Sequence, residues 1–374
     1  MIKIIVIGLL AFFLYFLQRK IYCRLWNRGL LVNVMFTNNT MFEGEKAELL
    51  EVIENRKRLP LPMLKVKFQT DRNLEFADTE GSSVTDQYYR NDVFQVGSGE
   101  KITRKLTFTG KRRGYYKING IDLVAADLFL SVHMMDNKVA DQYIYVYPKP
   151  YNSREFGLFL QQLSGEVLAK RHWVEDPFEY RGIREYQPYD DIRNVNWKAT
   201  AKTEDLKVNQ KNYTSIKTIR IFLNLDDSGV LKKTECVETS IQIAAGLADF
   251  FLAQGIRVAC YANGTDLISK DPVFVEAGAG RGQLDRIYRA LARINGHGET
   301  VSFPDYLGQK LFHEARGCMT FLVSPNHYPD FMELILEYQG SGEDFIWFYP
   351  VRDKQEPEIS GEIKSHVRVI HLRD

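Results

Sequence analysis

The sequence predicts an α+β protein of several domains: an N-terminal transmembrane helix, a β-sandwich domain and a doubly wound α/β domain. Three observations lead to this prediction. An uncharged apolar run fills residues 4–17, strand-like runs fill residues 30–150, and strand-like and helix-like runs alternate from there onward. We therefore expect an anchor at residues 1–29, a β-sandwich domain at 30–150 and an α/β domain at 151–374.

The N-terminal segment MIKIIVIGLLAFFLYFLQRK has the composition of a membrane anchor. Nothing is charged from Ile4 to Leu17, and the run approaches the roughly 17 to 25 residues that cross a bilayer. A signal peptide would need a small-residue cleavage site, but cations follow instead: Arg19, Lys20, Arg24 and Arg28. The positive-inside rule therefore predicts a single uncleaved span in the cell membrane, with the bulk of the chain in the cytoplasm. A buried core helix is the alternative, and the basic cluster argues against it.

Residues 30–150 predict the β-sandwich. Runs such as LLVNVMF, KAELLEVIEN and MLKVKFQ are of strand length, rich in β-branched and aromatic residues, and separated by Asn, Gly, Asp and Pro. The only histidine here is His133, and the acids are spread along strands and turns. We expect this domain to have a structural or adhesive role.

The second half predicts a parallel sheet covered by helices on both faces. The strand-like IKTIRIFLNL is followed by the helix-like ETSIQIAAGLADFFLAQG, the strand-like IRVACYAN and further alternation to HVRVIHL. In such folds, ligands bind at the carboxyl ends of the strands. This rule directs attention to the residues that follow Leu225.

Asp226 and Ser228 follow that strand within the turn DDSG. A carboxylate and a hydroxyl two residues apart can bind one hard cation such as Mg²⁺. The same four residues are also ordinary turn formers, and both interpretations stay open. The sequence contains no P-loop and no GxSxG nucleophile elbow.

Composition limits the partners. The chain has 374 residues, 45% hydrophobic and 26% charged, which is enough for two cores. Its 49 Lys and Arg nearly balance its 48 Asp and Glu, so we expect no nucleic-acid partner. No CxxC pair occurs, which argues against zinc and favours buried thiols in a reducing compartment for the four cysteines: Cys23, Cys236, Cys260 and Cys318.

The segment DPFEYRGIREYQPYDDIRNVNWKATAKTEDLKV, residues 176–208, fits neither a strand period nor a helix period. It resembles the signature of the bacterial family called domain of unknown function 58, roughly E-x-R-G-x-R-x-Y-x-x-G-D-x-x-R-x-I-x-W-x-A-x-A-R. The matching residues are Glu179, Arg181, Gly182, Arg184, Tyr186, Asp190, Arg193, Trp197, Ala199 and Ala201. Weaker echoes, such as RRGYYKINGIDLVAADLFL at 112–130, extend the resemblance over most of the chain.

The resemblance implies a membrane segment, a β-rich domain and a von Willebrand factor A-like α/β domain. Such domains carry a metal site that begins D-x-S-x-S, so the resemblance implies Asp226 and Ser228 as its first two ligands. The third position is Val230, which cannot coordinate, and Ser324, Pro325 and Asn326 stand where a later aspartate is expected. We therefore expect a degenerate site that binds Mg²⁺ weakly or not at all, and no other cofactor.

The signature segment allows two interpretations. Its arginines can present forked donors to a partner, with Tyr186 and Trp197 as aromatic anchors. Alternatively, the arginines pair with acids inside the segment, and the aromatics pack against the α/β domain. Acids and bases are nearly balanced in this stretch, which favours the structural interpretation.

Three functions follow as hypotheses. The preferred one is a non-enzymatic, membrane-anchored scaffold or adaptor; the resemblance implies a MoxR-type AAA+ ATPase as its partner, in envelope-related or complex-assembly processes. The second is a metal-dependent hydrolase centred on Asp226, with Asp266, Asp271 and Asp305 as further candidate acids. The third is a purely structural envelope protein.

Overall fold

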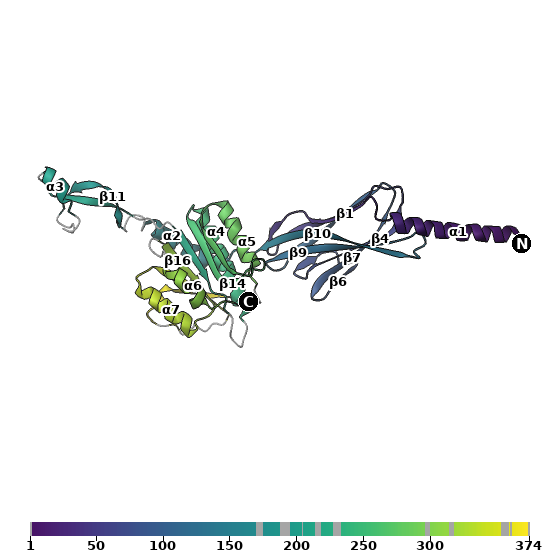
Figure 1. Cartoon of the computed structure of the whole chain (residues 1–374). Coiled ribbons are helices and arrows are strands. Elements are labelled where there is room, and N and C mark those ends of the chain that lie inside the picture. Colours follow the sequence, from purple (N-terminus) through teal and green to yellow (C-terminus); the bar gives the residue numbers. More distant parts are fainter. Residues whose placement is uncertain are drawn as a thin grey trace. The chain divides into compact units, whose positions relative to one another are not determined.

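The computed structural model describes residues 2–169, 175–187, 195–203, 205–213, 218–226, 233–295, 300–313, 318–352, 359 and 361–372. The chain divides into two compact units, unit 1 at Met1–Lys149 and unit 2 at Pro150–Asp374. Figure 1 shows an N-terminal helix, a β-rich part and a part in which helices and strands mix. The prediction of a mixed α/β chain with an apolar N-terminal helix and several sheets is confirmed.

Unit 1 begins with the helix α1, Ile2–Leu25. At about 1.5 Å per residue its 24 residues extend roughly 36 Å, and the helix is long and apolar enough to cross a membrane. A signal sequence would pass the same test of length and composition. Near its end the chain enters the core of unit 1, because Tyr22 and Trp26 are buried there.

Ten strands follow in unit 1, namely β1 Leu30–Phe36, β2 Thr40–Phe42, β3 Lys46–Asn55, β4 Leu61–Asp71, β5 Leu74–Phe76, β6 Ser82–Val84, β7 Gln87–Val96, β8 Lys101–Gly110, β9 Gly114–Ala126 and β10 His133–Tyr147. One sheet has the order β1-β3-β8-β5 and the other β2-β10-β9-β4-β7-β6. Pairing is antiparallel except between β2 and β10. Buried positions alternate with exposed ones along β7 and with partly exposed ones along β3, as expected for strands with one face in a core.

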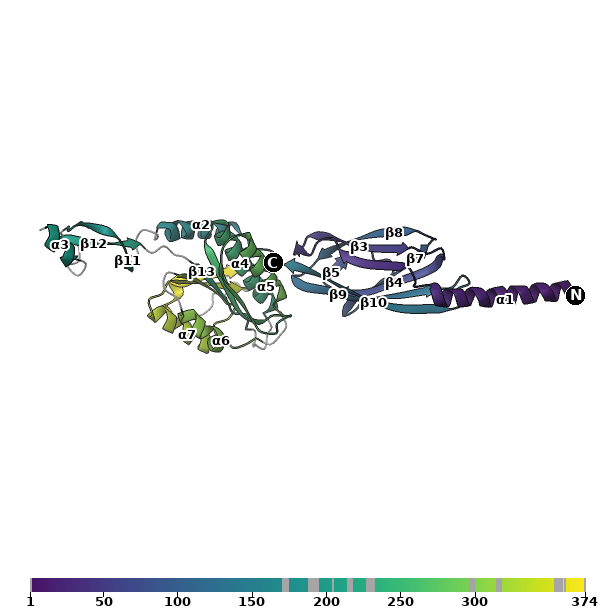
Figure 2. The same cartoon turned by 45° about the horizontal axis from the view of Figure 1, so that its top comes forward.

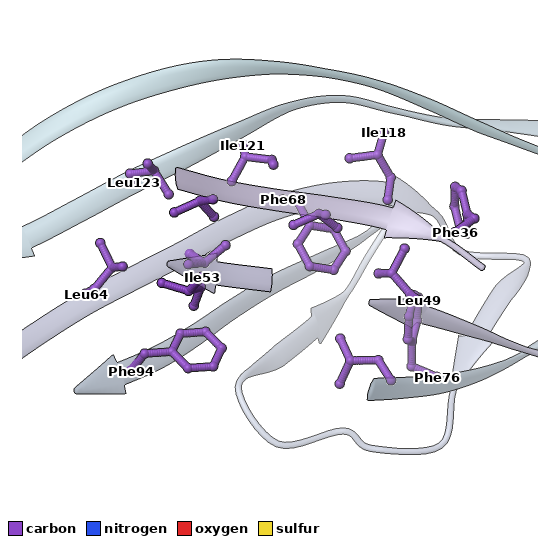
Figure 3. Close-up of a cluster of buried hydrophobic side chains, with 14 of the residues drawn as sticks. Phe36, Leu49, Ile53, Leu64, Phe68, Phe76, Phe94, Ile118, Ile121 and Leu123 are labelled. Carbon is purple, nitrogen blue, oxygen red and sulfur yellow. The ribbon is translucent and has the colours of Figure 1, made fainter. Parts of the chain in front are cut away.

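Both sheets contribute to one hydrophobic core. Leu49, on β3 of the first sheet, is fully buried, and so are Leu64 and Ile121, on β4 and β9 of the second. Figure 3 shows these side chains pointing toward one another, together with Phe68 and Phe94. The period-2 pattern of the sequence therefore produces a shared apolar interior.

Unit 2 is built on a six-stranded sheet with the order β15-β14-β13-β16-β17-β18. Its strands are β13 Thr218–Leu223, β14 Arg257–Thr265, β15 Pro272–Gly278, β16 Cys318–Val323, β17 Phe345–Val351 and β18 Val367–His371. All neighbours are parallel except β14 and β15. The expectation of a parallel sheet missed this edge strand, because a short turn joins β15 to β14 as a hairpin.

Helices cover both faces of this sheet. The helices of unit 2 outside the signature segment are α2 Arg154–Ala169, α4 Thr234–Ala253, α5 Arg281–Arg293, α6 Phe303–Phe312 and α7 Pro329–Gly340, with a 3₁₀ turn at Lys364–His366. Figure 2 shows α2, α4 and α5 on one side of the sheet and α6 and α7 on the other. α4 is also long and apolar enough to span a membrane, but 67% of its most apolar window is buried in unit 2.

The signature segment includes parts of two strands and a short helix. The sequence analysis found neither a strand period nor a helix period there, so it did not predict these elements. β11, Glu175–Glu185, pairs antiparallel with β12, Lys207–Tyr213, and α3 spans Trp197–Thr203. The register shifts twice, between Asp176 and Tyr180 and between Tyr180 and Gly182. These irregularities interrupt the alternation of side chains and hide the strand from a periodicity argument.

No disulfide joins the four cysteines, all of which lie within the described residues, and they differ in exposure. Cys236 and Cys260 are buried, whereas Cys23 lies exposed on α1. The expectation of four buried thiols is therefore wrong for Cys23, because that face of α1 does not meet the core of unit 1.

Candidate functional site

A polar network lies at the carboxyl ends of the central strands of unit 2. β13 is followed by Asn224 and β16 by Ser324 and Asn326, while Asn263 lies near the end of β14. The strand order reverses between β13 and β16, so this edge is the topological switch point at which α/β sheets bind ligands. These side chains are buried, which makes the network a candidate functional site.

Asn224 is the centre of the network. Its Nδ2 donates to Ser324 Oγ at 3.2 Å and to Asn326 Oδ1 at 3.3 Å. Its Oδ1 accepts from Asn263 Nδ2 and from the backbone N–H of Asp226, both at 3.1 Å. A buried amide with these four contacts has both its donors and its acceptor engaged.

The network also fixes the start of the loop after β13. Asn326 Nδ2 donates to the backbone carbonyl of Asp226 at 2.6 Å, and Asn263 Oδ1 accepts from Leu225 N at 2.8 Å. Trp347 Nε1 donates to the backbone carbonyl of Ser324 at 3.2 Å. Three strands therefore hold the backbone of Asp226 in place.

The side-chain amide oxygens described at this edge do not fit a metal ion. Asn224 Oδ1 and Asn263 Oδ1 already face N–H donors, and a cation there would have to displace them. Across the described chain, no three His, Cys, Asp or Glu side chains lie close enough to share a metal ion. Asp226 is half-buried at this edge, but Ser228 and Val230 lie outside the described residues, so the metal site stays a prediction.

The further acids of the hydrolase hypothesis lie in two places: Asp266 and Asp271 in the turn between β14 and β15, where Asp266 N donates to the backbone carbonyl of Asp271 at 2.9 Å, and Asp305 on α6. Asp266 Oδ1 accepts backbone N–H bonds from Ile268 and Ser269, and its Oδ2 lies 2.7 Å from Arg293 Nε. This carboxylate therefore holds the turn before β15. Asp305 lies in the first turn of α6, where a carboxylate favours the helix terminus.

Short-range hydrogen bonds hold the described residues of the signature segment around α3. Asn196 precedes α3, and its Oδ1 accepts from Ala199 N at 3.0 Å, which caps the helix. Lys207 N donates to Thr200 Oγ1 at 3.0 Å, and Val195 forms a bridge with Val208, both buried. α3 is therefore attached to the start of β12.

Around this framework, several apolar side chains are exposed. Trp197 is 65% exposed, Ile183 54% and Leu206 47%. A shallow hollow of about 450 Å³ on the hairpin is lined by Ile183, Arg184, Glu185, Gln187 and Lys207. The structural interpretation, in which the aromatics pack against the α/β domain, is therefore wrong for Trp197. We call Ile183, Arg184, Trp197, Leu206 and Lys207 the hairpin surface.

The charges of the segment are only partly described. Lys207 Nζ lies 3.2 Å from Glu185 Oε1, and Arg184 Nη1 donates to the backbone carbonyl of Glu185 at 2.9 Å. The backbones of Glu179 and Arg181 lie in β11, but their side chains are outside the described residues. Asp190 and Arg193 lie wholly outside them. Their predicted pairing stays a prediction.

Comparison with known proteins identifies the family. The model of the family described as protein of unknown function DUF58 matches residues 182–364. The chain belongs to the DUF58 family. The DUF58 match includes the polar network and these signature residues: Gly182, Arg184, Tyr186, Asp190, Arg193, Trp197, Ala199 and Ala201. No curated protein matches the chain.

Several solved structures show a limited similarity to this DUF58 protein. A non-cellulosomal cohesin from Archaeoglobus fulgidus has 12% identity and a TM-score of 0.22, covering 34% of this chain and 96% of its own. The sporulation control protein Spo0M from Bacillus subtilis has 11% identity and a TM-score of 0.18, covering 42% of this chain and 58% of its own. These TM-scores are too low to support an argument about fold or function.

A charged cluster in unit 1 lies outside the DUF58 match, and the sequence analysis missed it. The cluster consists of Glu51, Asp78, Arg90, Asp92 and Arg104. Arg90 Nε and Arg104 Nη1 lie 2.5 and 2.8 Å from the carboxylate of Asp92. Since Asp92 is on β7 and Arg104 on β8, the cluster joins the two sheets. A sequence signal exists, because Glu51, Arg90 and Asp92 occupy inward positions of the period-2 pattern, in phase with buried apolar residues of the same strands such as Ile53 and Phe94.

Glu51 is the unusual member of this cluster. Its side chain has no exposed surface, and neither carboxyl oxygen has a hydrogen-bond partner in the described part of the chain. Burial, followed by the charge of Asp92, raises the pKa of Glu51 to about 8. Glu51 is therefore mostly protonated at neutral pH.

Proposed function

We propose that this protein is a non-enzymatic, membrane-anchored scaffold whose hairpin surface docks a protein partner. The observation that supports docking is the exposure of Trp197, at 65%, at the start of a helix whose backbone is capped. A large aromatic side chain on an ordered framework loses little conformational freedom on binding, and tryptophan is enriched in binding hot spots.

The charge of the hairpin surface suggests the chemistry of the partner. Arg184 and Lys207 line the same hollow as Ile183, and Lys198 and Lys202 are exposed on α3. Cations around an apolar contact complement a partner with acidic residues around an apolar pocket. Family resemblance suggests a MoxR-type AAA+ ATPase as that partner, in envelope-related or complex-assembly processes.

The fold proposal is that unit 1 is a β-sandwich and unit 2 a von Willebrand factor A-like domain. Two sheets with one shared core support the first assignment. A sheet with helices on both faces and a polar edge at the switch point supports the second. Because the side-chain oxygens of Asn224 and Asn263 at that edge accept from N–H groups, this edge favours a structural role over metal-dependent hydrolysis.

The anchor proposal assigns α1 as an uncleaved membrane span, with units 1 and 2 in the cytoplasm. Its support is the length and apolarity of the helix, together with the exposed cations Arg19, Lys20 and Arg24 near its end. The burial of Tyr22 and Trp26 in the core of unit 1 adds a reason to expect retention, since cleavage after them, at the end of α1, would remove these core contacts.

Binding of a purified MoxR-type ATPase from the same organism to the vesicle-reconstituted chain tests the docking proposal. We expect Trp197→Ala combined with Arg184→Ala to weaken binding at least tenfold, since two hot-spot residues typically contribute more than about 1 kcal/mol each. Ile268→Ala is the matched control, because Ile268 is an exposed apolar residue elsewhere in unit 2. Circular dichroism establishes that each variant is folded.

The outcomes separate the hypotheses. Binding that survives in the folded double variant contradicts docking at the hairpin surface. Binding that is absent even from the wild type contradicts the ATPase as partner and leaves the structural envelope protein. Metal-dependent hydrolysis that disappears in Asp226→Ala would contradict the non-enzymatic scaffold.

A further inference from the structure

An exposed apolar loop lies beside α1 in unit 1. The loop joins β9 to β10 and carries Leu128, Phe129 and Leu130, which are 53%, 61% and 53% exposed. Single exposed apolar residues are common, but three consecutive large ones at a turn form a continuous apolar tip. We call these three residues the apolar tip.

Two contacts attach this loop to α1. Gln18 Nε2 donates to Asp127 Oδ2 at 2.9 Å, and the rings of Tyr15 and Phe129 lie 5.8 Å apart between centroids. A separate contact joins α1 to another part of unit 1 further along the helix, where Tyr22 OH donates to the backbone carbonyl of Pro60 at 3.1 Å. The apolar tip therefore has a fixed position along the helix.

The turn itself holds the apolar side chains outward. The carboxylate of Asp127 accepts from Ser131 N and Ser131 Oγ, both at 2.6 Å, and from Val132 N at 3.1 Å. Burial alone would raise the pKa of Asp127, but these hydrogen bonds and that of Gln18 hold it below its usual value. The carboxylate is thus ionised and closes the turn at neutral pH.

Leu130 adopts a backbone conformation that glycine or asparagine would adopt more easily. Its φ is +56°, in the left-handed region, which disfavours L-residues by roughly 1 kcal/mol or more. Burial in the protein core does not offset this strain, because the side chain is more than half exposed. A leucine at this position is explained by an apolar environment outside the protein.

The position of the tip along α1 identifies that environment. Phe129 contacts α1 at Tyr15, four residues before Arg19, the first cation after the apolar run. At about 1.5 Å per residue, this contact lies roughly 6 Å from Arg19 toward the apolar part of the helix. In a membrane-spanning α1, Arg19 and Lys20 reach the headgroups, and Phe129 then lies at the boundary with the acyl chains.

We propose that the apolar tip inserts into the lipid bilayer beside α1 and forms a second membrane contact of unit 1. This inference rests on the proposed membrane anchor. Leu128, Phe129 and Leu130 bury apolar surface among the acyl chains, while Arg19, Lys20 and Arg24 meet the headgroup phosphates. With two attachment points, unit 1 keeps one orientation on the membrane surface and does not rotate freely about the helix.

Site-specific photocrosslinking in the full chain tests this inference. A p-benzoylphenylalanine is placed at position 129, 84 or 10, one at a time, and the protein is reconstituted into phosphatidylcholine and phosphatidylglycerol vesicles. Val84 is the matched control, because it is 59% exposed and lies away from α1. It pairs with Tyr88 at the start of β7, whereas Pro60, which contacts α1, is next to Leu61, which pairs with the opposite end of β7. Position 10 reports on α1 itself, where Leu10 is 57% exposed.

We expect mass spectrometry to find lipid adducts at positions 129 and 10, with at least tenfold less adduct at position 84. Adducts at position 10 without adducts at 129 would overturn the inference and leave the membrane anchor intact. Adducts at neither position would overturn both. Crosslinks from position 129 to protein in place of lipid, or equal labelling at 84, would also reject the inserted loop.

Discussion

Arg220 and Leu311 are 91 residues apart in the sequence, and the guanidinium of Arg220 donates a 2.5 Å hydrogen bond to the backbone carbonyl of Leu311. The same guanidinium donates to the carbonyls of Lys310 and His313, so it caps the end of α6. Arg220 is only 3% exposed. A cation buried at a helix C-terminus satisfies carbonyls that have no partner within the helix.

We expect Arg220→Met to lower the free energy of unfolding by about 3 kcal/mol, because it leaves several buried carbonyls unpaired. Hydrogen exchange of the α6 amides should accelerate accordingly. Arg289→Met is the control, since Arg289 forms a half-exposed pair with Asp285 on α5, which typically contributes less than about 1 kcal/mol. Unchanged exchange in α6 would contradict the capping role.

The polar network at the carboxyl edge gives a second prediction. We expect Asn224→Ala to destabilise unit 2 by about 2 to 3 kcal/mol, because Asn263 and Asn326 each lose a buried partner. Thermal unfolding in detergent measures this loss. Gln339→Ala is the control, since the amide of Gln339 on α7 makes an exposed hydrogen bond to the backbone carbonyl of Glu362.

A third prediction concerns the metal at the same edge. We expect millimolar Mg²⁺ to change the melting temperature of the wild type and of Asp226→Ala by the same amount, since the amide oxygens of Asn263 and Asn224 beside Asp226 already accept from N–H groups. A Mg²⁺-dependent increase of more than about 3 °C that Asp226→Ala removes would establish a functional cation site.

The sequence predicted the elements with regular patterns and missed those set by tertiary contacts. The apolar run of α1, the alternation along β3 and the buried strand β13 each produced a correct element. β15 was missed, because its pairing depends on β14 and not on a strong pattern of its own. The shifted register of β11 concealed a strand in the same way.

The candidate site was predicted only in its location. The rule on strand ends led to Asp226, and the network does lie at this edge. Asn263, however, stands inside a strand, with nothing in its local sequence to relate it to Asn224. The charged cluster of unit 1 was missed for a related reason. The strand patterns place Glu51 and Asp92 at inward positions, but they do not show that the two residues meet, since they come from different sheets.

Exposure of Trp197 gives a fourth prediction, which separates a docking role from a structural role. We expect Trp197→Ala to change the free energy of unfolding by less than about 0.5 kcal/mol, as is usual for surface positions. Trp347→Ala should cost about 3 to 5 kcal/mol, because Trp347 is fully buried. Similar losses in both variants would show that Trp197 packs against the protein.

Glu51 gives a fifth prediction, on pH dependence. Its pKa in the folded protein is raised to about 8, from a model-peptide value of about 4.3 in the unfolded chain. Between these two values the folded state binds more protons than the unfolded state, so the contribution of Glu51 to stability is greatest at low pH and is lost as pH rises toward 8. Asp78 and Asp127 have lowered pKa values, so they titrate below this window.

We therefore expect the melting temperature of unit 1 to fall between about pH 5 and pH 8, and Glu51→Gln to remove most of this decrease, because a neutral amide cannot ionise. Glu48→Gln is the matched control, since Glu48 lies on the same strand and is partly exposed beside Lys105. The side chain of Arg104 is opposite Glu51 in the register of β3 and β8, so ionised Glu51 gains some attraction there. A wild-type melting temperature that stays constant over this range would show that this attraction cancels the effect of burial.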